Sequence, residues 1–203
     1  MVTGHAYPWD VLGDPSFVDR SPPAVTLAAA YHSVRAATPL HPSRRIVDAR
    51  HAALYRPIRD SVWTDLRPKA PDWMDEPDPF GTAAAILRAA GRRVTAWIVL
   101  THNTRLGTLR PDVTVVNCFG ERYPYALCPA HAEVRDYAAT LAAEAVRDAR
   151  STGSRWRRAA SSASPTSATT RRPTVRGRRG SPRCCRSAAA PPAGAPGRAR
   201  RTR

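Results

Sequence analysis

The sequence predicts an α/β fold in which inner parallel strands alternate with helices. The run Val94–Leu100 holds seven apolar or β-branched residues in succession, which indicates a strand buried on both faces. A helical pattern precedes it at Asp78–Ala90 and another follows it at His131–Arg150. This rhythm of strand, loop and helix fits the N-terminal part of a (β/α)8 barrel, and a doubly wound sheet is the alternative.

The first two elements of that rhythm are a short strand and a longer one. Val2–Tyr7 is the candidate first strand. Asp14–Arg20 follows as one or two helical turns, with Asp14 as the N-cap and Pro15 at the first helical position. Ala24–Tyr31 is the second apolar run, and its β-branched residues and the prolines before it favour a strand over a helix.

Residues 33–77 form a long irregular segment rich in Arg, Pro, Trp and Asp. Within it, Arg45–Asp48 and Ala53–Tyr55 are predicted to pair as a small hairpin. A loop of this length in a compact domain usually has a function. Its aromatic rings suit a wall on which a sugar stacks, or else they simply bury the loop. These rings belong to Tyr55, Trp63 and Trp73.

Two helices flank the central strand. Asp78 and Pro79 open the first helix as N-cap and first residue, and Gly91 closes it. Residues 104–129 form a second long excursion, and a helix begins after Pro129. The buried face of the first helix comprises Phe80, Ala83, Ala84 and Leu87, and that of the second comprises Val134, Tyr137, Ala138, Leu141 and Ala145.

Polar and aromatic side chains follow both inner strands. Tyr31 and His32 end the strand at Ala24–Tyr31, and His102 and Asn103 follow Val94–Leu100. Because active sites of α/β folds lie at the carboxyl ends of parallel strands, these four residues are predicted to line one substrate-binding cleft. The alternative is that His102 and Asn103 only cap the strand and bond to nearby backbone.

Motifs for other chemistry are weak, and no cofactor or metal ion is expected. Cys184-Cys185 lacks a second ligand pair at zinc spacing, and Cys118 and Cys128 have only His131 near them in sequence. Glycoside hydrolysis needs two carboxylates about 5–10 Å apart. The acids available in the loops are Asp48, Asp60, Asp112 and Glu121, but none ends a predicted strand, so the catalytic residues stay unknown.

Charge divides the chain into two parts. Of the 203 residues, 1–150 hold all 16 acids and 18 basic residues, whereas 151–203 hold 14 Arg and no acid. The first part is expected to be one domain, and the second a disordered Arg/Ala/Ser/Pro-rich tail that binds polyanions without sequence preference. There is no long apolar run and no signal peptide, which predicts a cytoplasmic protein without membrane contact.

Three segments resemble a family of uncharacterised alanine-rich bacterial proteins grouped with hypothetical TIM-barrel glycosyl hydrolases. The segments are LAAAYHSVRAATPLHP, AWIVLTHNTRLG and NCFGERYPYALCPAHAEVRDYAATL, and the resemblance covers most of residues 1–150. It implies a carbohydrate ligand. The chain departs from the family around Ser21–Ala24, where the first helix is shortened, and after Arg150.

Back-translation of the tail indicates an out-of-frame reading of the fourth barrel strand, whereas its composition is shared by low-complexity linkers and decides little. Shifted back by one base, permitted codons for Trp156-Arg157-Arg158 encode Leu-Glu-Ala, and those for Ser161–Arg172 encode a segment with two His and several acids. The chain would then lack its catalytic carboxylate and be an inactive, truncated glycosidase-like protein. The alternative function is non-specific nucleic-acid binding through the tail.

Overall fold

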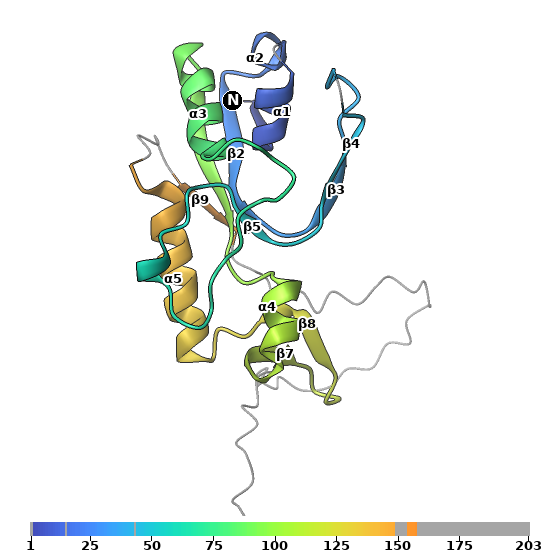
Figure 1. Ribbon diagram of the computed structural model, residues 1–203, viewed down its shortest axis with the longest axis vertical. Coiled ribbons are helices and arrows are strands. Elements are labelled where there is room, and N and C mark those ends of the chain that lie inside the picture. Colours follow the sequence, from blue (N-terminus) through green and yellow to red (C-terminus); the bar gives the residue numbers. More distant parts are fainter. Residues whose placement is uncertain (1, 15, 43, 149–153, 158–203) are drawn as a thin grey trace, which may run out of the picture.

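The main sheet consists of parallel strands that are neighbours in chain order. The computed structural model describes residues 2–14, 16–42, 44–148 and 154–157. Within them, β1 (Thr3–Ala6), β2 (Ala24–Tyr31), β6 (Arg93–Val99) and β9 (Ser154–Arg157) pair successively in parallel. The short strand β5 (Ala53–Leu54) joins β2 in the antiparallel sense (Figure 1). The predicted α/β class is confirmed.

One face of this sheet is covered by helices. The helices α1 (Pro8–Gly13), α3 (Pro79–Ala89) and α5 (Ala132–Val146) contribute side chains to the same core as the sheet. From β2 and β6 this core takes alternate residues, as the two-residue period of a strand requires. These residues are Val25, Leu27, Ala29, Val94, Ala96 and Ile98, and Ala30 joins them beyond an irregularity in the register at the end of β2.

The opposite face carries a different set of side chains. The strand register places His5, Thr26 and Thr95 side by side on three neighbouring strands. Two residues further along, it places Ala28 beside Trp97. Because neighbours in register point to the same side of a sheet, these residues share the face turned away from the helices. Trp97 is the bulkiest of them and is 8% exposed.

Helix α3 follows its sequence prediction closely. The Asp78 carboxylate accepts a hydrogen bond from the Gly81 N–H at 3.0 Å, and Pro79 occupies the first turn. Gly91 has a φ of 73°, a left-handed conformation that glycine adopts without strain, so the helix ends there. The buried face is the predicted one, with Phe80, Ala83, Ala84 and Leu87 all inaccessible to solvent.

The prediction that a helix begins at Asp14 is wrong. A helix not foreseen from the sequence, α1, occupies Pro8–Gly13 and is followed by Asp14 as its C-cap. The Asp14 carboxylate accepts a hydrogen bond from the Ser16 N–H at 3.1 Å and pairs with Arg20. The second helix, α2, therefore begins only at Phe17 and ends at Arg20. Asp14 caps the turn between the two helices instead of opening one.

The predicted hairpin between Arg45–Asp48 and Ala53–Tyr55 does not form. Instead, β4 (Ile46–Ala49) pairs antiparallel with β3 (Val34–Ala37), and the two make a curved ribbon apart from the main sheet (Figure 1). Both residues of β5 are buried, and they pair with the end of β2. Burial against an inner strand thus outweighs pairing with the nearer segment. The 3-10 turn η1 covers Asp60–Val62.

The excursion after β6 contains its own small assembly. It consists of α4 (Thr104–Leu109), the 3-10 turn η2 (Pro111–Val113) and the antiparallel pair β7 (Thr114–Val116) and β8 (Arg122–Leu127). Gly107 lets α4 approach β8, since a Cβ there would lie 1.9 Å from the Pro124 carbonyl oxygen. This assembly lies beyond the carboxyl ends of β2 and β6 (Figure 1).

The expectation that residues 151–203 are a disordered tail is wrong at Ser154–Arg157. These four residues form β9 and pair with Ala96–Val99 of β6. The parallel edge of β6 offers unpaired backbone groups, and a strand that follows α5 is placed to satisfy them. The remaining residues of the predicted tail, 158–203, and residues 151–153 lie outside the described part of the chain.

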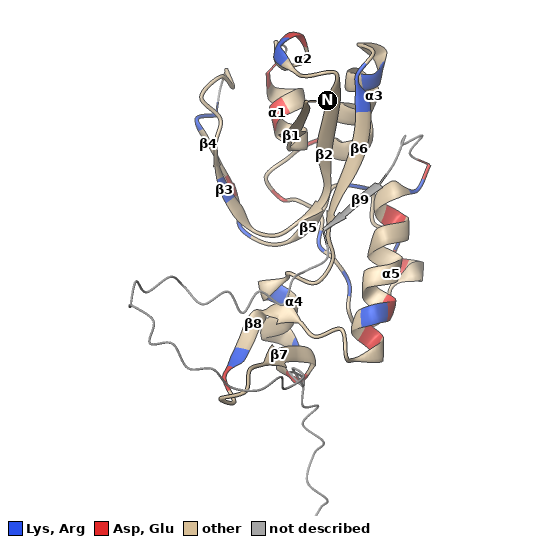
Figure 2. Ribbon diagram, turned by 180° about the vertical axis from the view of Figure 1, so that it is seen from behind, with Lys and Arg blue, Asp and Glu red and all other residues tan. Residues whose placement is uncertain are grey.

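Ion pairs fasten the long segment 33–77 to the helices. Arg59 donates to both carboxylate oxygens of Glu144 in α5, with Nε at 3.0 Å from Oε2. Arg56 Nη1 lies 2.8 Å from Asp78 Oδ2 at the start of α3, and its Nη2 lies 2.6 Å from the Arg147 carbonyl oxygen. Helix α5 carries three acids, Glu133, Asp136 and Glu144, and one base, Arg135 (Figure 2).

Candidate functional site

Aromatic rings gather where the parallel strands end. Tyr31 and His32 lie at the end of β2, with ring centroids 4.2 Å apart and planes 29° apart. His32 stacks in turn on His102, which follows β6, at 4.5 Å and 20°. Parallel strands end at the same edge of a sheet, and this edge brings together three of the four predicted site residues.

The stack continues in both directions. Tyr31 meets Tyr7 and Trp97 edge to face, at 5.2 Å and 4.5 Å, and His102 lies 5.3 Å from Tyr125 of β8. Trp9 stacks on Tyr7 at 4.4 Å but leads through Tyr55 into the core, so we leave it out and call the other connected rings at this edge the aromatic array. Its members are His5, Tyr7, Tyr31, His32, Trp97, His102, Tyr123 and Tyr125.

Asn103 has a different place from the other predicted residues. It is 2% exposed, and its side-chain oxygen accepts a hydrogen bond from the Leu106 N–H at 3.0 Å, which caps α4. Its Nδ2 lies 3.5 Å from the Tyr137 hydroxyl. Asn103 shares with Tyr31 and His102 only a crevice of ≈ 10 Å³, which is too small for an organic ligand. Its geometry therefore matches the capping alternative.

Two rings of the array, His102 and Tyr7, are uncharged near neutral pH. Burial lowers the pKa of His102, and the adjacent His32 lowers it further. Burial also raises the pKa of Tyr7, and the interaction with the neighbouring Tyr31 hydroxyl raises it further. Neutral rings of this kind offer apolar faces and a few polar edges, which suits stacking against a neutral ligand better than nucleophilic chemistry.

The loop carboxylates named from the sequence are each engaged with a partner outside the array. Asp48, Asp60 and Asp112 are exposed and pair with Arg35, Arg67 and Arg110, respectively. Glu121, also exposed, accepts a hydrogen bond from the Asn117 side chain at 2.7 Å. Each of these four acids thus has a separate partner among the described residues.

Cysteine and metal chemistry have little support among the described residues. Cys118 is exposed, Cys128 is buried, and both are free thiols. In the part of the chain that the structure describes, no three His, Cys, Asp or Glu side chains are grouped so as to hold a metal ion. The pair Cys184-Cys185 falls outside that part.

The three loop aromatics proposed as a sugar wall serve mainly to bury the loop. Tyr55 is fully buried, and Trp63 and Trp73 pack against the core next to Tyr137 and Tyr55. The strand-end rule identified Tyr31, His32 and His102, but it missed Trp97, Tyr123 and Tyr125. The alternation of faces along β6 is the signal that could have found Trp97.

Comparison with protein-family models, with curated proteins and with solved structures gives no match to this chain. Among the described residues, every helix is too short or too polar to cross a membrane. The case for a function therefore depends on the geometry of the aromatic array.

Proposed function

We propose that this chain is the front part of a glycosidase-like (β/α)8 barrel and binds a neutral carbohydrate at the aromatic array. The observation that carries the proposal is the unbroken contact of rings from Tyr7 through Tyr31 and His32 to His102 at the carboxyl ends of three strands. Sugar rings present apolar C–H faces that pack on aromatic planes, and hydroxyl groups that imidazole and phenol edges can bond.

The order of the strands supports the barrel part of the proposal. In such barrels each strand lies next to its successor in the chain, with a helix between them. Here β1, β2, β6 and β9 are neighbours in that order, and helices α1, α3 and α5 occupy the three connections. An out-of-frame origin of the tail would explain why the array lacks a paired carboxylate, so we expect binding without hydrolysis.

Replacing Tyr31 with alanine tests the carbohydrate proposal. Tyr31 touches Tyr7, His32 and Trp97, so its removal should break the array and weaken oligosaccharide binding at least about tenfold, the loss of about 1.4 kcal/mol. The measurement is titration calorimetry with cellohexaose, xylohexaose, maltohexaose and mannohexaose.

The matched control is Phe119→Ala, because Phe119 is 86% exposed and stands outside the array. It should leave the affinity unchanged. Binding that is equal in the two variants, or undetectable for all four sugars with the unaltered chain, would contradict the proposal.

We also propose non-specific polyanion binding by residues 151–203, because 14 Arg without a single acid create a strong local positive charge. Affinity for two DNA duplexes of unrelated sequence should be equal, and it should fall at least about tenfold between roughly 0.05 and 0.2 M salt. Fluorescence anisotropy with the full chain measures both. A clear preference for one duplex, or no salt dependence, would argue against this second function.

A further inference from the structure

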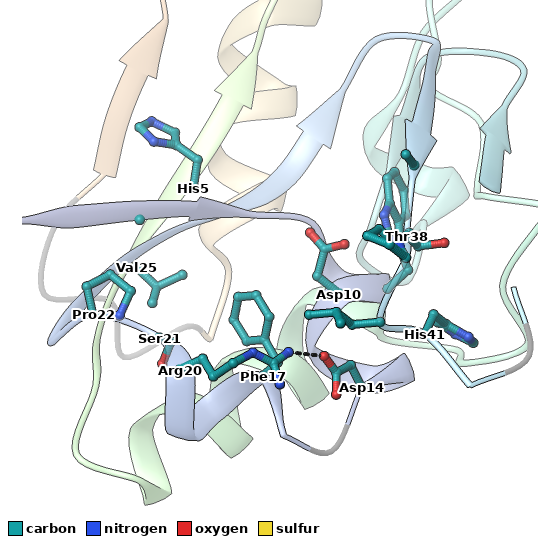
Figure 3. Close-up of a pocket in the computed structure, with 15 residues that line it drawn as sticks. His5, Asp10, Asp14, Phe17, Arg20, Ser21, Pro22, Val25, Thr38 and His41 are labelled. Atoms are coloured by element: carbon teal, nitrogen blue, oxygen red, sulfur yellow. Dashed lines mark hydrogen bonds and ion pairs between the residues drawn. The ribbon is translucent and has the colours of Figure 1, made fainter. Parts of the chain in front are cut away.

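A cavity lies beside β1, at the edge of the main sheet. It measures ≈ 310 Å³ and is enclosed by the start of β2, the helices α1 and α2, and the turn between β3 and β4 (Figure 3). Pro22 and Val25 mark its position near the amino ends of the strands, away from the carboxyl ends where the array gathers. His5 contributes to both places.

Most of the cavity wall is apolar. Phe17 and Trp9 supply aromatic surface, and the aliphatic surface comes from Pro22, Val25 and Leu40. The volume lies at the lower end of the range of organic ligand sites. A ligand of this size would bury most of its own apolar surface here.

Asp10 brings a carboxylate into this apolar wall. Within the described part of the chain it accepts one hydrogen bond, from the Tyr7 N–H to Oδ2 at 2.8 Å, which leaves Oδ1 able to bind a ligand. Burial raises the pKa of Asp10, and the neighbouring Asp14 charge raises it further. The Tyr7 N–H and the nearby His41 offset part of this burial cost, and a cation beside the carboxylate would offset more of it.

Several other polar groups of the wall are already engaged. Asp14 pairs with Arg20, the Thr38 hydroxyl donates to the Arg44 carbonyl oxygen, and the Ser21 hydroxyl donates to the Val18 carbonyl oxygen. The indole N–H of Trp9 is an exception, since it is buried and has no hydrogen-bond partner among the described residues. Besides the imidazoles of His5 and His41, the wall thus offers the Asp10 carboxylate as an acceptor and the Trp9 indole N–H as a donor.

We propose that this cavity binds a compact organic amine, whose ammonium group contacts Asp10 and whose apolar body packs between Phe17 and Leu40. An ammonium group gains both from the carboxylate and from the faces of nearby aromatic rings. Arg20 does not compete for Asp10, because it pairs with Asp14. This inference is independent of carbohydrate binding at the array.

Phenethylamine is the probe, and phenethyl alcohol and phenylacetate are its neutral and anionic counterparts. Titration calorimetry with the full chain at mildly alkaline pH should give a Kd on the order of 1 mM for the amine, with at least about tenfold weaker binding of the other two. Asp10→Asn should weaken the amine at least about tenfold as well, because it removes the charge but keeps an oxygen for the Tyr7 N–H.

Two further variants make the test specific. Asp19→Asn removes an exposed acid of α2 outside the cavity and should leave the affinity unchanged. Ala37→Trp should abolish binding by filling the cavity, and because Ala37 is exposed the fold should tolerate it. The proposal would be overturned if the amine did not bind or bound no more tightly than the alcohol. It would also be overturned if Asp10→Asn or Ala37→Trp left the binding unchanged.

Discussion

Replacing Arg56 with alanine is expected to lower the free energy of unfolding by about 3 kcal/mol, at the low end for removing one partner of a buried ion pair, because the Asp78 side chain is 32% exposed. Arg56 is 8% exposed. Its guanidinium contacts Asp78 and the Arg147 carbonyl oxygen, and it lies over the Phe80 ring at 5.9 Å from the ring centroid. Alanine would leave a cavity, and it would leave these polar partners without a hydrogen-bonding group.

The size of this effect follows from where Arg56 stands in the fold. The preceding residue, Tyr55, donates its N–H to the Ala29 carbonyl oxygen at 2.8 Å and accepts from the Phe80 N–H at 2.9 Å. The short segment Tyr55-Arg56 therefore joins β2, the start of α3 and the end of α5. Loss of Arg56 weakens all three junctions together.

Urea unfolding monitored by circular dichroism measures the change. Arg35→Ala is the matched control, since Arg35 pairs with Asp48 at 3.4 Å but its side chain is 77% exposed, and we expect a change below about 1 kcal/mol. Arg56→Lys should fall between the two, because a lysine keeps the charge but cannot hold both contacts in one plane. A loss in Arg56→Ala no larger than in Arg35→Ala would refute this account.

The elements that sequence reasoning located were those governed by short-range rules. The strand Ala24–Tyr31 was predicted with its exact bounds, and Asp78, Pro79 and Gly91 delimited α3 correctly. Each of these rests on an apolar run or on a capping residue whose effect is local. Such signals need no knowledge of the rest of the chain.

The errors arose where a distant contact decided the outcome. Ala53–Leu54 pairs with β2 because both residues are buried against the inner sheet, and no local pattern distinguishes that partner from the nearer strand β4. Asp14 resembles an N-cap in sequence, but α1 ends there and Arg20 binds its carboxylate.

The candidate site was predictable only where a general rule of parallel sheets applies. Tyr31, His32 and His102 follow strand ends, and a general property of parallel sheets brought them together. Asn103 obeys the same rule, yet its side chain turns inward to cap α4. Tyr123 and Tyr125 join the array only because α4 and the β7–β8 pair fold beneath the sheet edge, which depends on tertiary packing.

Glu144→Gln is expected to lower the free energy of unfolding by about 2 kcal/mol at neutral pH, since hydrogen bonds to a charged group contribute about that much. The Glu144 side chain is 5% exposed, and both its oxygens accept from Arg59. Arg59 is itself 47% exposed, so solvent screening keeps the effect below that of a fully buried pair.

The same contact makes the stability depend on pH. The hydrogen bonds from Arg59, and the charges of Arg59 and Arg147, lower the pKa of Glu144 in the folded chain. The unfolded chain, with a glutamate pKa of about 4.3, then binds more protons than the folded one in the interval below that value. This contribution to stability is complete above pH of about 4.3 and is lost as the pH falls through the lower, folded value.

Urea midpoints measured between pH of about 7 and about 3 test this expectation. The decline in stability at acid pH should be shallower in Glu144→Gln than in the unaltered chain, because one linked carboxylate is gone. Asp136→Asn removes an exposed acid from the same helix and should keep the original slope. If Glu144→Gln and Asp136→Asn gave the same pH profile, the ion pair between α5 and the long loop would not control the acid stability of this fold.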